Sequence, residues 1–302
     1  MMDLVKLLRS NLHRYFCSRS FLIFSLFSVA VGAWLGIMIY RESMFGTAET
    51  WLVILQWALL SVFTTLTVGK EHAHGGFRRK CVPGHSKGKI FIAELLIAFF
   101  VSTLLFLMCG LPVVLINVQI IPNFTAKILF YFIIGVWLGN LLVVAISLTL
   151  AMLVPHGTAA SAVSLLLILC MLLWADTVSV RLEQSEYQNT IRYDPITDSF
   201  VKQQEKNPKY IYPPTRDVLK TVDSALPITQ LSFCASTLRS CFLSDEAWAQ
   251  KWEGLPSDAP QRPDTVADED YQTMTAFPLY SLAWIVLIVA IGFLLFRRKS
   301  LK

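Results

Sequence analysis

Three histidines and one cysteine lie close together between residues 69 and 89, and their side chains are of the types that bind metal ions. Imidazole nitrogen and thiolate sulfur are common zinc ligands. The four residues are His72, His74, Cys81 and His85. Their spacing matches no compact zinc motif, and three consecutive cations at positions 78–80 would repel a dication. We therefore expect histidines that contact solvent or a partner, and no metal site.

The same segment could also be tested for a nucleotide site, because it contains a Gly-Lys pair. A phosphate-binding P-loop requires Gly, four residues and then Gly-Lys-Ser or Gly-Lys-Thr. Gly88 and Lys89 are followed by Ile90, and Pro83 stands where the first glycine is required. Neither a catalytic triad nor a His-Glu-x-x-His pattern can be assembled from the spans. The sequence predicts no enzyme activity, no cofactor and no ATP site in this chain.

Glu94 is the one acid inside a long apolar run. A carboxylate in a membrane-spanning helix is costly unless it is paired or reaches water. Glu94 follows Lys89 by little more than one helical turn, so we expect it to reach the interface or to pair with Lys87 or an arginine of the loop. Gln56 and Asn140 are uncharged and are expected to bridge helices. A proton-coupled carrier, which would need carboxylates near the middle of the membrane, is disfavoured.

Six apolar runs are long enough to cross a hydrocarbon core of roughly 30 Å as helices. They cover Phe21–Tyr40, Trp51–Val68, Ile90–Leu111, Ile128–Leu153, Ala159–Trp174 and Leu279–Phe296. Only 16% of the residues are charged, against roughly 25% in an average soluble protein. Pro155 and Gly157 predict a tight turn between the fourth and fifth runs. The predicted fold class is an all-α membrane protein with six transmembrane helices.

The distribution of charge predicts which side of the membrane each loop occupies. Lys and Arg beside a span stay in the cytoplasm, and they gather before the first run, in the loop 69–89 and after the last run. The short loops on the other side of the membrane contain only two basic residues, Arg41 and Lys127. Residues 176–276 contain sixteen acids and ten bases, a net charge of −6, which leaves +11 for the rest. We therefore predict a cell-membrane protein with both termini in the cytoplasm, and no nucleic-acid partner.

These patterns divide the chain into four predicted parts. Residues 1–20 form an amphipathic helix suited to the lipid interface, residues 21–175 hold the first five spans, residues 176–277 form an extracellular segment, and residues 278–302 hold the sixth span and a basic tail. The apolar face of the first helix is formed by Leu4, Leu8, Leu12, Tyr15 and Phe16, and its polar face by Lys6, Arg9, His13 and Arg14.

The extracellular segment contains one predicted short helix and one candidate disulfide. Thr215 is placed to cap a helix that ends at Pro227, and residues 245–270 are expected to be loop. Cys234 and Cys241 are the only cysteines on the predicted oxidising side. Seven residues of straight helix would separate them by about 10.5 Å, beyond the roughly 7 Å limit of a disulfide. A bond therefore requires a bend between them, and free thiols are the alternative.

The loop 69–89 resembles the first cytoplasmic loop of type-2 ATP-binding cassette exporter permeases of Gram-positive bacteria. Those proteins show a Glu, a Gly, an Arg-x-Lys and a Gly-x-Ser in this order. The corresponding residues here are Glu71, Gly75-Gly76, Arg78-Arg79-Lys80 and Gly84-His85-Ser86. Gly76 replaces a common Thr or Ser, and Arg79 replaces a common Asn. The first helix and the segment Leu226–Gln230 are also similar to that family, although Thr229 stands where a Gly is usual.

The resemblance implies a permease that works as a homodimer or heterodimer with separate ATPase subunits, which bind ATP and Mg²⁺. A short coupling helix in the first cytoplasmic loop would dock in the ATPase. The implied docking residues are Glu71, Phe77, Arg78, Arg79, Lys80, His85 and Ser86, with Phe77 as the apolar anchor. The expected function is export of an amphipathic or peptide-like compound. The alternative is a membrane receptor or assembly protein whose extracellular segment binds a ligand.

The predicted topology is testable by cysteine labelling in a cysteine-free background. We expect Phe200→Cys to react in intact cells with a thiol reagent that does not cross membranes, because the charge pattern places residues 176–276 outside. Reaction only after permeabilisation would contradict the topology.

The candidate disulfide is testable by mass spectrometry of the intact chain after alkylation, with and without reductant. We expect Cys234 and Cys241 to be alkylated only after reduction. Alkylation of both without reductant would show free thiols and would favour a continuous helix between them.

Overall fold

The computed structural model describes most of the chain. The described residues are 2–42, 48–82, 84–118, 126–154, 156–174, 177–178, 180–182, 184–194, 199–230 and 268–299. Cys234 and Cys241, and almost all of the predicted loop 245–270, lie outside them.

Among the described residues, six helices are long and apolar enough to cross a membrane, as the hydrophobic runs predict. They are α2 (Arg19–Glu42), α3 (Ala48–Ala73), α5 (Lys87–Ile116), α6 (Ala126–Leu153), α7 (Gly157–Trp174) and α12 (Asp268–Arg298). Each contains one predicted run and extends past it at one end or both. This is the architecture of a multi-pass membrane protein. The extension of α3 to Ala73 matters most, because it places Glu71 on a spanning helix.

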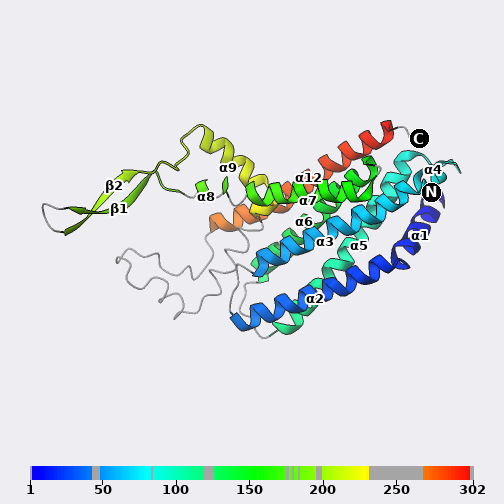
Figure 1. The fold of residues 1–302 in the computed structure, drawn as a ribbon, viewed down its shortest axis with the longest axis horizontal. Coiled ribbons are helices and arrows are strands. Elements are labelled where there is room, and N and C mark those ends of the chain that lie inside the picture. Colours follow the sequence, from blue (N-terminus) through cyan, green and yellow to red (C-terminus); the bar gives the residue numbers. More distant parts are fainter. Residues whose placement is uncertain are drawn as a thin grey trace.

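The six helices form one elongated bundle (Figure 1). Helix α2 packs along α5, α3 packs against α6 and α7, and α12 packs along α6. Only residues 154–156 separate α6 from α7, as the tight turn predicts. Hydroxyl groups join α3, α6 and α7: Ser61 Oγ and Ser147 Oγ each lie 2.8 Å from Ser164 Oγ, and Thr65 Oγ1 lies 2.5 Å from Ser161 Oγ.

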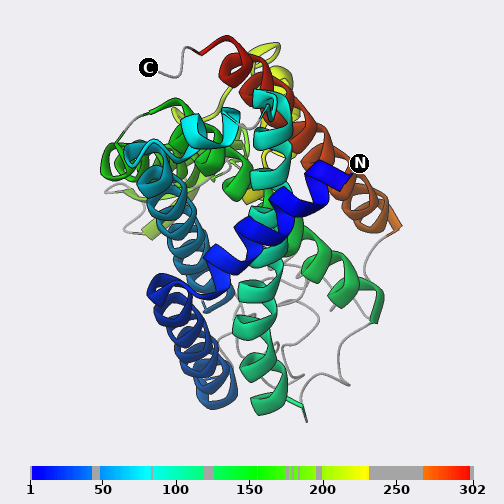
Figure 2. The ribbon, with the colours of Figure 1, turned by 90° about the vertical axis from the view of Figure 1, so that its right-hand side faces the viewer.

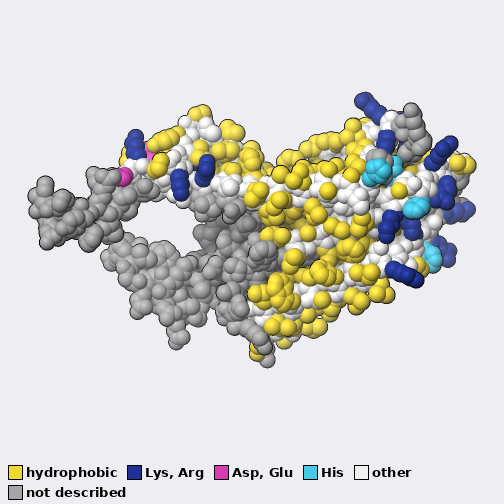
Figure 3. Space-filling view, viewed as in Figure 1, with side chains coloured by type: hydrophobic (Ala, Val, Ile, Leu, Met, Phe, Trp, Pro, Cys, Tyr) yellow, Lys and Arg dark blue, Asp and Glu magenta, His cyan; other side chains and the backbone are white. Residues whose placement is uncertain are grey.

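The two ends of the bundle differ in charge. One end carries helix α1 (Met2–Phe16), the short helix α4 (Gly76–Cys81) and the end of α12 (Figure 1), and we call it the loop end. Lys, Arg and His side chains gather there, beyond a band of hydrophobic side chains on the spanning helices (Figure 3). We call the opposite end, where residues 187–206 form a β-hairpin (Figure 1), the hairpin end. The basic residues on which the topology prediction rests therefore share one end of the bundle.

Helix α1 crosses the loop end over α5, at an angle to the spanning helices (Figure 2). Its residues Leu7, Asn11 and Tyr15, spaced four apart, are buried, whereas Lys6 and Arg9 are exposed. Phe16, which the sequence places on the apolar face, is exposed at the protein surface. The buried stripe therefore includes a polar residue, Asn11, that the hydrophobic pattern leaves out.

The hairpin end carries a two-stranded antiparallel sheet, which corrects the all-α expectation in this segment. Strands β1 (Tyr187–Asp194) and β2 (Ser199–Lys206) pair from Tyr187↔Lys206 to Asp194↔Ser199. They are preceded by α8 (Val180–Leu182) and followed by α9 (Thr215–Ala225). Strand β1 contains Thr, Ile and Tyr, which are residue types that favour strands. The N-cap of α9 is Pro214 and not Thr215, which is the first helical residue.

The segment after α9 returns to the spanning helices. Ile228 is buried among Val53, Trp57, Val136 and Ile168 of α3, α6 and α7. Gln230 accepts a hydrogen bond from Ser281 Oγ of α12 at 3.1 Å, and Trp284 Nε1 donates to the carbonyl of Ala225 at 3.0 Å. Residues 226–230 are therefore packed into the hairpin end of the bundle.

Candidate functional site

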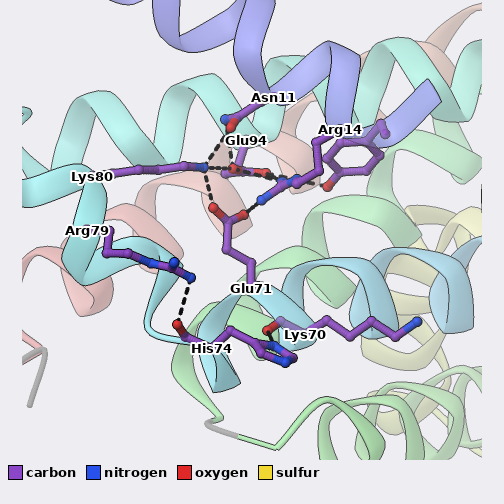
Figure 4. Close-up of polar contacts among 9 residues, drawn as sticks. Asn11, Arg14, Lys70, Glu71, His74, Arg79, Lys80 and Glu94 are labelled. Atoms are coloured by element: carbon purple, nitrogen blue, oxygen red, sulfur yellow. Dashed lines mark hydrogen bonds and ion pairs between the residues drawn. The ribbon is translucent and has the colours of Figure 1, made fainter. Parts of the chain in front are cut away.

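Glu94 of α5 is the centre of a charged cluster at the loop end. Its side chain is 0% exposed. The carboxylate accepts hydrogen bonds from Lys80 Nζ at 2.7 Å, Asn11 Nδ2 at 2.7 Å and the Arg14 guanidinium at 2.9 Å. Glu71 faces the same two cations: its Oε1 lies 2.5 Å from Lys80 Nζ, and Arg14 also pairs with it. Figure 4 shows these five side chains converging.

The charged cluster, defined as Asn11, Arg14, Glu71, Lys80 and Glu94, joins four helices. Asn11 and Arg14 come from α1, Glu71 from α3, Lys80 from α4 and Glu94 from α5. Two cations oppose two carboxylates, so the charges balance. Lys80 Nζ also donates to Asn11 Oδ1 at 2.7 Å. Buried charges are tolerated when they are paired and hydrogen-bonded, and every charged side chain of this cluster has an ion-pair partner.

The two carboxylates of the cluster are shielded from water: the Glu71 side chain is 7% exposed and that of Glu94 is 0% exposed. Burial raises the pKa of the Tyr15 hydroxyl far above its ordinary value, and the neighbouring charge of Glu94 adds to the effect. Burial also lowers the pKa of Lys80, while Glu94 opposes that change by favouring the charged ammonium. Loss of Lys80 or of Glu94 would therefore leave the charge of the other residue buried and poorly hydrated.

Two glycines allow α4 to fold back close to Glu71. Gly75 has a φ angle of 66°, in the left-handed region that glycine adopts without strain. A Cβ atom on Gly76 would lie 2.4 Å from Glu71 Cγ, which is a clash. Gly76, which replaces a common Thr or Ser of the resembled loop, therefore leaves room for the Glu71 side chain inside the charged cluster.

Helix α4 has an inner face and an outer face. Phe77 and Lys80, three residues apart, point into the protein; Phe77 is only 2% exposed and packs edge-on against Phe296 of α12. Arg78 and Arg79 are exposed, and Val82, directly after the helix, is 81% exposed. The expectation that Phe77 is a surface anchor is therefore corrected, since helical periodicity places it opposite the arginines. Val82 is the apolar side chain at the surface.

The remaining predicted docking residues have separate positions. Glu71 and Lys80 belong to the charged cluster. Ser86 caps α5, accepting a hydrogen bond from the backbone N–H of Lys89 at 3.4 Å, and His85 is half-buried. Arg79 donates to the carbonyl of His74 at 2.9 Å. Lys87, expected as a partner of Glu94, instead donates to the carbonyl of Lys299 at 2.5 Å.

Sequence reasoning missed the contribution of α1 to this site. Asn11, Arg14 and Tyr15 are three of the four side chains that donate hydrogen bonds to Glu94, the fourth being Lys80, although the hydrophobic pattern assigned Arg14 to the polar face. The available signal was Asn11 itself, a hydrogen-bonding residue in register with Leu7 and Tyr15. A buried carboxylate in one helix and a polar residue in an otherwise apolar stripe of another are candidates to meet.

A second contact fixes the end of α12 at the loop end. Lys299 Nζ donates to the carbonyls of Met152 and Leu153, both at 2.9 Å, and lies 2.6 Å from His72 Nε2. A cation at the last carbonyls of a helix interacts favourably with the helix dipole. Lys299 thus caps α6 and joins the basic tail to α3 and α6.

Comparisons with known proteins add no family to this description. No protein-family model matches the chain, and a search of curated proteins finds no significant match. Among the described residues, no group of three or more His, Cys, Asp or Glu side chains could hold a metal ion. The candidate functional site consists of the charged cluster and the outer face of α4.

The charged cluster predicts a large effect of Glu94→Gln. Neutralising this carboxylate leaves Lys80 and Arg14 facing Glu71 alone, and breaking a buried ion pair costs about 3 kcal/mol or more of unfolding free energy. The double variant Glu94→Gln/Lys80→Met restores the charge balance and should recover most of the loss. Lys89→Gln, at an exposed cation of the same end, should change stability by less than about 0.5 kcal/mol. Unfolding by denaturing detergent in mixed micelles measures each value, and equal stability of Glu94→Gln and wild type would contradict the cluster.

Proposed function

We propose that this chain is the permease subunit of an ATP-binding cassette transporter, and that it exports an amphipathic or peptide-like compound. The observation that carries the proposal is the two-faced helix α4. Its outer face offers Arg78, Arg79 and Val82 to a partner, and its inner face connects through Lys80 to Glu94 on spanning helix α5. The resemblance of loop 69–89 to the first cytoplasmic loop of exporter permeases supports the same assignment.

The proposed partner is a separate ATPase subunit that binds ATP and Mg²⁺. Two exposed guanidinium groups around an exposed Val82 suit an acidic rim surrounding an apolar pocket, since complementary charge favours docking and an apolar side chain can be buried on contact. The loop end would then face the cytoplasm of the cell, where ATP is available, and a second permease subunit would complete the transporter.

The charged cluster connects α4 to the spanning helices, so docking at α4 can be transmitted to them. Lys80 cannot move away from Glu71 and Glu94 without leaving buried charges unpaired, so a push on α4 is transmitted to α3, α5 and α1 together. Phe77, packed against Phe296, connects the same movement to α12. In this proposal α4 is the coupling helix, and the charged cluster is what makes it rigid against the spanning helices.

The docking proposal predicts that Arg78→Glu/Arg79→Glu abolishes association with the ATPase. Reversing two charges at the contact should cost about 2–5 kcal/mol for each desolvated pair, enough to remove co-purification when a candidate ATP-binding subunit is co-expressed. Both arginines are exposed and lie outside the charged cluster, so the variant should insert and fold as wild type does.

The matched control is Lys70→Glu/Lys89→Glu, which reverses two exposed cations at the same end. We expect the control to retain the ATPase at wild-type stoichiometry. Retention by the α4 variant, with normal transport-coupled hydrolysis, would reject docking through α4 and would favour the alternative function of a receptor or assembly protein.

A further inference from the structure

Two side-chain amides inside the bundle make no hydrogen bond. Gln56 of α3 is 3% exposed and Asn140 of α6 is 0% exposed, and none of their four amide nitrogen and oxygen atoms has a partner. The indole Nε1 of the buried Trp57, next to Gln56, is also without an acceptor. Unpaired polar groups are expensive inside a membrane, where water does not replace the missing partner. Three such groups on two helices that pack against each other indicate a function other than packing.

The two amides lie at similar depth. Ser61 of α3 and Ser147 of α6 both bond to Ser164, which fixes the relative height of two helices that run in the same direction. Gln56 precedes Ser61 by five residues and Asn140 precedes Ser147 by seven. At about 1.5 Å per residue, their heights differ by only about 3 Å.

Apolar side chains surround this level of the bundle. Val53 and Trp57 of α3 pack with Val136 and Val143 of α6, which flank Gln56 and Asn140 in sequence. Ile228, from the segment that returns to the bundle after α9, belongs to the same core and closes it toward the hairpin end. The polar groups therefore lie at a level of the bundle that is otherwise lined by apolar side chains, a setting that small-molecule sites share.

These polar groups suit an uncharged ligand group. The two amides and the indole together offer donors and acceptors but no charge. The sequence has no Asp, Glu, Lys or Arg at positions 50–69 or 128–174, so the helices on both sides carry no charge at this level. A secondary amide or a hydroxyl, which both donates and accepts, matches these polar groups; an ammonium or a carboxylate would lose its hydration without a counter-charge.

We propose that Gln56, Trp57 and Asn140 form an intramembrane binding site for the neutral amide or hydroxyl group of an amphipathic compound. The proposal deepens the proposed export function and rests on it for the identity of the compound as cargo. Binding itself needs no ATPase. The site lies within one chain, among α3, α6 and α7, and the segment 226–230 covers it at the hairpin end.

The experiment uses the full chain in lipid nanodiscs without any partner. The probe is N-acetyl-photoleucyl-leucinamide, a neutral capped dipeptide with three amides and a photoreactive apolar side chain. After irradiation, adducts are mapped by mass spectrometry. We expect adducts in residues 53–60 and 136–143, and at least a fivefold lower yield there in Gln56→Met/Asn140→Leu. The control Ser102→Ala removes a buried hydroxyl of α5 that also lacks a partner, and it should leave the yield unchanged.

Thermal unfolding separates this role from helix packing. Because the near-isosteric apolar replacements remove unpaired polar atoms, Gln56→Met/Asn140→Leu should unfold at the wild-type temperature or above. A lower unfolding temperature would show that the amides hold the helices together and would overturn the proposal. Adducts confined to exposed residues such as Leu26 and Leu279, or an unchanged yield in the double variant, would overturn it as well. Neither result bears on docking of an ATPase, which is tested by co-purification.

Discussion

The burial of Glu94 is the constraint on which the loop end depends. A carboxylate with no solvent exposure must have opposite charge and hydrogen-bond donors close by, and no single neighbouring helix supplies them all. The chain meets this requirement by bringing α1 across α5 and by folding α4 back against the end of α3. Glu94 thus helps to fix the positions of α1 and α4, together with the burial of Leu7, Tyr15 and Phe77.

The ion pairs of Lys80 with Glu71 and Glu94 also give the cations of the loop two different roles, one inside the protein and one at its surface. All three cations at positions 78–80 could serve a partner equally well if only their charge is considered. In the folded chain Lys80 is committed to Glu71 and Glu94, while Arg78 and Arg79 stay at the surface. A helix of six residues can therefore have one face fixed to the spanning helices and the other available for contact. This division supports the proposal that α4 transmits movement from a partner to the membrane.

The spanning helices were predictable because length and hydropathy decide them, and all six runs appear as helices. The burial of individual residues in the short helices α1 and α4 was not predictable, because it depends on which face of each helix turns inward. Phe77 was expected at the surface and is buried, and Arg14 was expected in solvent and reaches Glu94. Arg14 contacts Glu94, 80 residues further along the chain. Phe77 contacts Phe296 of α12, about 220 residues further along the chain. The hairpin β1–β2 was missed because its polar strands lack a hydrophobic alternation strong enough to indicate a sheet.

Photocrosslinking at Val82 tests the central claim most directly. A benzophenone amino acid at this position, in membranes that contain the chain and a co-expressed candidate ATP-binding subunit, should crosslink to that subunit, because Val82 is exposed directly after α4, whose outer face carries Arg78 and Arg79. The same probe at Leu279, exposed on α12 toward the opposite end of the bundle, should crosslink no ATPase. A probe at Val82 that reacts only with lipid or with its own chain, while the ATPase co-purifies, would contradict the account.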